Sequence, residues 1–101
     1  MARLAARVDD NQREICAFLR GYPGVAYAVT SSLGRGFPDL VVSYCGVNDL
    51  WELKDGRKPK SAQKLTLAEF EFHERWRGPI VVIRSKTDAL NRLDWLRGRG
   101  A

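Results

Sequence analysis

Four short runs of β-branched, aliphatic and aromatic residues constrain the fold of this 101-residue chain more than any other sequence feature. Three of them, at residues 25–30, 39–44 and 50–54, are separated only by turn-forming residues, including a predicted hairpin connection at residues 46–49. They predict three strands that pair as a meander. The fourth run, at residues 80–83, is uniformly apolar, which is typical of a fully buried strand.

Helix signals precede and follow the first three runs. Acidic residues at positions 9–10 open a helix that the turn-forming residues 21–24 end. Thr66 and Glu69 match a capping box, which predicts a second helix that reaches Trp76.

A last helix is expected after the fourth run. Thr87 is its predicted cap, and the basic, glycine-rich residues 97–101 are expected to fray. The order is therefore helix, three strands, helix, strand, helix. This order predicts an α/β domain with a mixed sheet flanked by helices. We expect one domain over residues 1–101, with its core at about residues 8–96.

Composition places the chain among globular proteins and gives it a positive charge. Hydrophobic residues make up 45% of the chain and its formal net charge is +5, which argues against disorder and favours an anionic partner such as nucleic acid. Cys16 and Cys45 have neither metal-binding nor disulfide spacing, so we expect a reduced, cytoplasmic protein. The sequence shows no signal peptide and no apolar run of the length that a membrane span requires, so no membrane partner is expected.

Polar residues occupy strand positions where apolar ones would be expected. Alternation along the third run places Leu50, Glu52 and Lys54 on one face of the strand. Asp39 opens the neighbouring strand, and a hairpin can bring it beside Glu52. Glu14 borders the apolar stripe of the first helix, so it can also point toward the sheet.

Such a set of residues is suited to phosphodiester hydrolysis. Carboxylate oxygens bind Mg²⁺, which polarises the phosphoryl group and lowers the pKa of a bound water. A lysine beside that water can orient it or stabilise the developing charge. The alternative interpretation is a solvated pair, Glu52 and Lys54, with Asp39 as an ordinary turn residue at the start of a strand.

Longer sequence blocks surround these residues in a fixed order. The first three read VDDNQREI at residues 8–15, GRGFPDLVV at 34–42 and WELKDG at 51–56. Two more lie at residues 65–69, followed by Phe72 and Trp76, and at residues 88–90. Together these blocks resemble the VRR-NUC family of the PD-(D/E)xK nuclease superfamily, over about residues 8–90.

The resemblance implies a restriction-endonuclease-like core in the order helix–strand–strand–strand–helix–strand, and a divalent metal, Mg²⁺ or Mn²⁺. It also implies a homodimer that cleaves branched DNA such as four-way junctions. By position, Asp39 and Glu52 would bind the metal together with the backbone carbonyl of Leu53. Lys54 would act on the attacking water, and Glu14 would bind a second metal or a metal-bound water.

Glu69 is a further catalytic candidate. It stands where the family often has glutamine, and Leu67 stands where a proline is common. His73, the one histidine, is assigned a packing or surface role.

Basic residues near these motifs are candidates for contact with DNA phosphates, although a solvated loop explains them equally well. They are Arg35, Arg57, Lys58, Lys60 and Lys64.

The leading hypothesis is therefore a metal-dependent DNA endonuclease that acts as a homodimer. One alternative is a catalytically silent nucleic-acid-binding module. Another is a nuclease subunit that needs a partner protein.

Overall fold

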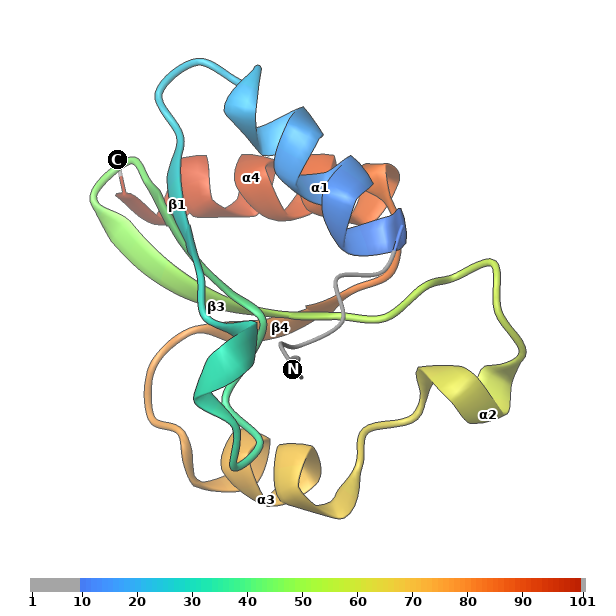
Figure 1. Cartoon of the computed structure of the whole chain (residues 1–101). Helices are drawn as coiled ribbons and strands as arrows, with labels where there is room; N and C mark the ends of the chain where they lie inside the picture. Colours follow the sequence, from blue (N-terminus) through green and yellow to red (C-terminus); the bar gives the residue numbers. More distant parts are fainter. Residues whose placement is uncertain (1–9, 101) are drawn as a thin grey trace.

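The computed structural model describes residues 10–100, so the predicted helix start at Asp9 lies outside the described residues. Two layers of helices enclose a four-stranded sheet (Figure 1). The elements, in chain order, are α1 (Asp10–Arg20), β1 (Ala26–Val29), the 3-10 turn η1 (Ser31–Leu33), β2 (Leu40–Tyr44), β3 (Val47–Leu53), α2 (Lys60–Gln63), α3 (Leu67–Arg75), β4 (Ile80–Ile83) and α4 (Lys86–Gly100).

The strand order in the sheet is β1-β2-β3-β4. β1, β2 and β3 form the predicted antiparallel meander, and β4 pairs in parallel with β3 after the crossover through α3. The mixed sheet is therefore confirmed. β4 is an edge strand, and only Ile83 in it is fully buried. The prediction that the fourth strand is buried throughout was wrong, because a strand at the edge has a neighbour on one side only.

The hairpin between β2 and β3 is tighter than the sequence suggested. Its turn consists of Cys45 and Gly46, with φ angles of 53° and 81°. Two consecutive positive φ angles are the geometry of a type I′ turn, which matches the twist of paired strands. β3 therefore begins at Val47, inside the predicted connection at residues 46–49, and Tyr44 pairs with Val47.

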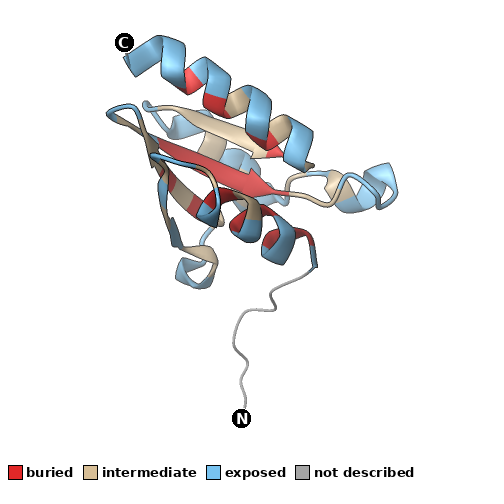
Figure 2. Cartoon of the chain, turned by 90° about the horizontal axis from the view of Figure 1, so that it is seen from above, coloured by how far each residue is buried: buried red, intermediate tan, exposed pale blue. Residues whose placement is uncertain are grey.

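α1 and α4 cover one face of the sheet, and α3 lies against the other (Figure 1). Trp51 and Leu53 of β3 point to the α1–α4 face, where the core lies between the buried faces of the helices and the sheet (Figure 2). Their partners there include Ile15, Leu19, Leu40, Val42, Leu93 and Leu96, which are completely or almost completely buried. Each such side chain contributes about 1.5–3 kcal/mol by its burial. Alternation then leaves Glu52 and Lys54 on the α3 face.

A buried ion pair anchors α4 to the sheet. Asp49 of β3 is completely buried, and Arg92 of α4 donates two hydrogen bonds to it, at 2.7 and 2.9 Å. The indole N–H of Trp51 donates a third, at 2.7 Å. Asp49 is therefore fully engaged in the core and is separate from the acidic residues on the α3 face.

The ends of α4 differ from the sequence-based expectation. Oγ of Ser85, not the side chain of Thr87, accepts the hydrogen bond from the backbone N–H of Asp88. The helix continues to Gly100, so the predicted frayed tail was wrong over residues 97–100. Arg97 donates to the hydroxyl groups of Tyr22 and Tyr44, and these contacts hold the last turns against the sheet.

α3 approaches the turn before β2 very closely. A Cβ atom built on Gly36 would lie 2.2 Å from the carbonyl oxygen of Ala68, and Gly36 also has a φ of 81°. Glycine is therefore required at this position. Next to it, the rings of Phe37 and Phe72 meet edge to face, with 5.2 Å between centroids. This packing places the first turn of α3 beside the end of β3.

Candidate active site

The register of the hairpin determines where Asp39 lies. Leu40 pairs with Trp51, so the next position outward sets Asp39 opposite Glu52. The backbone N–H of Asp39 still donates to the carbonyl of Trp51, at 3.0 Å. Its side chain then accepts a hydrogen bond from the backbone N–H of Leu53, at 2.8 Å. Asp39 is thereby fixed at the end of β2 with its carboxylate against β3.

Glu52 is a buried carboxyl group beside a second one. Its side chain is 3% exposed, and its Oε1 atom has no hydrogen-bond partner among the described residues. Burial, together with the neighbouring carboxylate of Asp39, raises the pKa of Glu52 to about 9. Burial also raises the pKa of Asp39, against the opposing effect of the Leu53 N–H. Without a cation, the pair therefore resists carrying two negative charges.

Lys54 lies on the same face as Glu52 and is held by α3. Its Nζ atom is 2.8 Å from Oε1 of Glu69 and 4.0 Å from Oε2 of Glu52. The side chain of Lys54 is only 13% exposed. Burial raises the pKa of Glu69, but the hydrogen bonds from Lys54 and from the backbone of Thr66 outweigh it and leave this pKa lowered. Glu69 is therefore a charged partner that orients the lysine amine.

The capping box of α3 is the device that positions Glu69. Oε1 of Glu69 accepts from the backbone N–H of Thr66, at 2.8 Å, while the N–H of Glu69 donates to Oγ1 of Thr66, at 3.2 Å. The box was predicted from the sequence and is confirmed. Its second task, the contact with Lys54, was not predicted.

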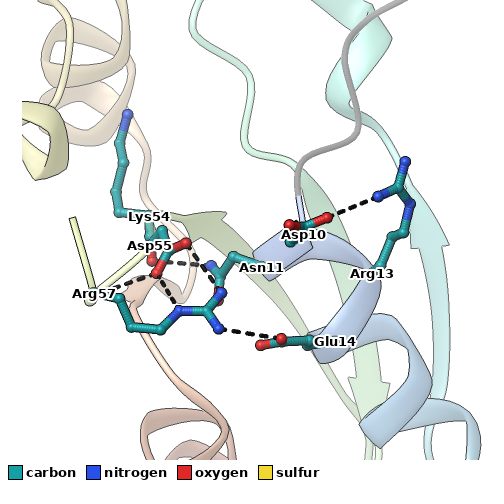
Figure 3. Close-up of polar contacts among 7 residues, drawn as sticks. All are labelled: Asp10, Asn11, Arg13, Glu14, Lys54, Asp55 and Arg57. Carbon is teal, nitrogen blue, oxygen red and sulfur yellow. Dashed lines mark hydrogen bonds and ion pairs between the residues drawn. The ribbon is translucent and has the colours of Figure 1, made fainter.

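Glu14 lies in a different set of contacts (Figure 3). Its Oε2 atom lies 3.2 Å from Nη1 of Arg57. The same guanidinium also binds Asp55, with 2.9 Å between its Nε atom and Oδ1 of Asp55. In Figure 3 the carboxylate of Glu14 points to Arg57, whereas the amine of Lys54 extends away from both. Asp39 and Glu52 shift each other's pKa, and the charges of Glu69 and Lys54 act on the pKa values of both.

α1 contributes to the site through Asn11, which the sequence analysis did not single out. Asn11 is 3% exposed, and its Nδ2 atom donates to the carbonyl oxygen of Lys54 at 3.0 Å (Figure 3). This hydrogen bond holds the end of β3 against α1 at Lys54. Both the burial of Asn11 and its contact across 43 positions are properties of the fold, so no sequence signal pointed to it.

The predicted phosphate-binding residues divide into two groups. The guanidinium of Arg57 is occupied by Asp55 and Glu14. By contrast, Lys58, Lys60 and Lys64 are exposed and have no ion pair within the described part of the chain.

Two further residues stand near the site. Arg35 is exposed in the turn next to α3, with a φ of 58°. His73 lies one turn beyond Glu69 and is half-buried, and its Nε2 atom has no hydrogen-bond partner among residues 10–100. Burial lowers the pKa of His73, and the charges of Glu69 and Lys54 also act on it. His73 therefore packs at the margin of this site, where burial favours its neutral form.

The donor set suits a hard divalent cation. No group of three or more His, Cys, Asp or Glu side chains in residues 10–100 is arranged to hold a metal ion. Asp39 and Glu52 provide two carboxylates, one with an unpartnered buried oxygen. A residue's N–H and C=O point to the same edge of a strand, so the carbonyl of Leu53 also faces Asp39. Two carboxylates and one carbonyl, completed by water, are ligands that Mg²⁺ accepts.

Comparisons with protein-family models, with curated proteins and with solved structures give no match for this chain. None of the helices in the described residues has the length and apolar character needed to cross a membrane.

Proposed function

We propose that this chain is a metal-dependent DNA endonuclease that hydrolyses phosphodiester bonds, with a VRR-NUC-type site on a restriction-endonuclease-like core. The observation that carries the proposal is the convergence of three groups on one face of the sheet. Asp39 faces Glu52 across the hairpin, and the amine of Lys54 lies 4.0 Å from the same glutamate. Two carboxylates and an amine are the groups that this chemistry needs.

Each residue has a separate task in the proposed site. Asp39, Glu52 and the carbonyl of Leu53 would hold Mg²⁺ or Mn²⁺, which when bound polarises a phosphoryl oxygen and acidifies a water. The amine of Lys54 orients the attacking water and stabilises the charge that develops on the phosphate.

Of the two remaining glutamates, only Glu69 supports these groups in the proposal. Glu69 holds the amine of Lys54 through its hydrogen bond at 2.8 Å. Glu14 is outside the first set of metal ligands, because its carboxylate is engaged by Arg57. A role for Glu14 in binding a second metal would require Arg57 to release it.

The substrate class in this proposal is DNA with a branched structure, such as a four-way junction, cut by a homodimer. The net charge of +5 favours a polyanion. The preference for branched DNA and the dimer come from the family resemblance. A symmetric dimer would present two sites to two strands.

Cleavage of matched linear, flapped, single-stranded and four-way DNA tests the function. The parent protein should cut in Mg²⁺ or Mn²⁺ and stop cutting when a chelator is added. Glu52→Gln and Lys54→Ala should each lower the rate by about a hundredfold or more. Asp94→Asn, an exposed acid paired with Arg97 on α4, is the matched control and should retain the parent rate.

Three outcomes would count against the proposal as stated. Undiminished cleavage by Glu52→Gln would show that the site lies elsewhere. Tight DNA binding by the parent without cleavage in either metal would favour a silent binding module. Cleavage that begins only when a partner protein is added would favour a nuclease subunit.

A further inference from the structure

Two adjoining clefts lie where the sheet meets the connection between β3 and α3. One, of about 590 Å³, extends past the end of β3 from Asn11 and Gly56 to the start of α4. The other, of about 360 Å³, is lined by Lys60, Gln63, Lys64 and Arg84. Gln63 and Arg84 line both clefts, so the two spaces meet at these residues.

Gln63 fixes the head group of Arg84. Oε1 of Gln63 accepts a hydrogen bond from Nε of Arg84, at 3.0 Å. Its Nε2 atom donates to the carbonyl oxygens of Lys58, at 2.7 Å, and Gly56, at 3.3 Å. The amide therefore ties Arg84 to the connection after β3. The two terminal nitrogens of Arg84 have no hydrogen-bond acceptor among residues 10–100, so they are available to an anion. A guanidinium held in this way loses little side-chain freedom when it binds.

The charge around Arg84 is not neutralised. Residues 56–68 contain no acid and four cations, and Lys60 and Lys64 have no ion pair within the described residues. Asp88, the nearest acid along the chain, has one carboxylate oxygen engaged by the backbone N–H of Arg84, at 2.9 Å. Arg57 differs, because Asp55 and Glu14 occupy its guanidinium. Uncompensated positive charge therefore gathers at Arg84, Lys60 and Lys64.

This charge lies next to the proposed catalytic lysine. The N–H of Lys54 donates to the carbonyl of Ile83, and the N–H of Gly56 donates to that of Arg84, both at 3.0 Å. Arg84 therefore directly follows β4, the strand that neighbours β3, and lies beside Lys54 at the end of the sheet. Each strand of a duplex carries one phosphate per about 3.4 Å along its axis, so two anion sites this close fit one nucleic acid backbone.

We propose that Arg84, oriented by Gln63 and flanked by Lys60 and Lys64, binds a second phosphate of the DNA strand whose scissile phosphate lies at Lys54. The inference rests on the proposed function and adds a substrate-binding site to it. Arg84 contacts the substrate backbone, Gln63 is a positioning residue, and Arg57 is an internal tether of the connection.

Binding without cleavage tests this site. A labelled single-stranded oligonucleotide is titrated in EDTA at several salt concentrations with the parent, Arg84→Ala, Gln63→Ala and the double variant. Arg20→Ala is the matched control, because Arg20 is an exposed arginine that donates to Tyr27 of β1, at the far edge of the sheet. Thermal melting of each variant checks its folding.

Arg84→Ala should weaken binding by about tenfold, the size expected for one charge-assisted contact. It should also lower the slope of log affinity against log salt by about 0.7, as expected for one lost phosphate contact on a single strand. Gln63→Ala should weaken binding by a smaller factor with an unchanged slope, because every charge remains. The double variant should bind like Arg84→Ala, since Gln63 acts through Arg84.

Equal losses in Arg84→Ala and Arg20→Ala would overturn the inference, because they would reveal general charge attraction in place of a site. Parent-like binding by Arg84→Ala, together with metal-dependent cleavage by the parent, would overturn the second phosphate site and leave the nuclease proposal standing. If Arg84→Ala bound DNA more weakly and the parent protein never cleaved it, the results would support the phosphate site and count against the nuclease.

Discussion

The amine of Lys54 donates a hydrogen bond to Oε1 of Glu69 at 2.8 Å, and the same oxygen accepts from the backbone N–H of Thr66 at 2.8 Å. One carboxylate oxygen therefore closes the cap of α3 and holds the proposed catalytic amine. Helix stability and the orientation of Lys54 are coupled through this atom, so substitutions at Glu69 should affect both.

Glu69→Ala should reduce cleavage by about tenfold to a hundredfold, because the lysine amine loses its anchor. It should also cost about 1 kcal/mol of unfolding free energy through the lost cap, measured by urea denaturation. Glu69→Gln keeps an oxygen acceptor for both donors, so it should retain most of the cap and most of the activity. A Glu69→Gln variant as inactive as Glu69→Ala would show that the negative charge, not the positioning, is what matters.

The buried carboxyl of Glu52 predicts a pH-dependent stability in the absence of metal. Its pKa is raised from 4.5 to about 9, so its neutral form is the one that the fold favours. The corresponding stability is fully present below the unfolded-state pKa and is lost as the pH rises through about 9. The parent should therefore become less stable than Glu52→Gln as the pH increases across this window.

Urea denaturation in EDTA at about pH 5, 7 and 9 measures this effect. The difference in unfolding free energy between Glu52→Gln and the parent should grow at each step. Asp94→Asn, which changes an exposed acid, should follow the parent at all three values. A difference that stays constant with pH would mean that Glu52 is ionised throughout the range.

Metal binding should stabilise the folded protein independently of any cleavage. A cation that binds only the folded state adds about 2.7 kcal/mol when its concentration is a hundred times its Kd. The melting temperature of the parent should therefore rise with Mn²⁺ concentration, whereas Asp39→Asn and Glu52→Gln should respond weakly. If all three proteins melted at the same temperature with and without Mn²⁺, these two carboxylates would not be the ligands.

Apart from the short elements η1 and α2, which were not predicted, the order of helices and strands followed from local sequence patterns, and so did the capping box at Thr66 and Glu69. Alternation in β3 also placed Glu52 and Lys54 on one face, because a side-chain period of two is a property of any strand. The sequence was compatible with Asp39 lying beside Glu52, but it did not predict this arrangement. It depends on the register of the hairpin, and the turn that sets this register was placed too late in the chain.

Residues whose roles arise from distant contacts could not be found from the sequence. Arg84 is oriented by Gln63, which lies 21 positions away, and Asn11 reaches the carbonyl of Lys54 across 43 positions. Glu14 shows the reverse case. Its position beside the apolar stripe of α1 suggested an approach to the acidic pair, but its carboxylate is drawn to Arg57, also 43 positions away.

The hairpin turn gives a prediction in which stability and activity separate. Cys45 adopts a φ of 53°, which asparagine tolerates better than most residues, and Asn-Gly is the preferred type I′ pair. Cys45→Asn should therefore raise the unfolding free energy by about 0.5–1 kcal/mol without changing cleavage. Urea denaturation and the cleavage assay measure the two quantities separately. A cleavage rate that changed in Cys45→Asn would mean that the turn affects the site beyond setting the register of Asp39 opposite Glu52.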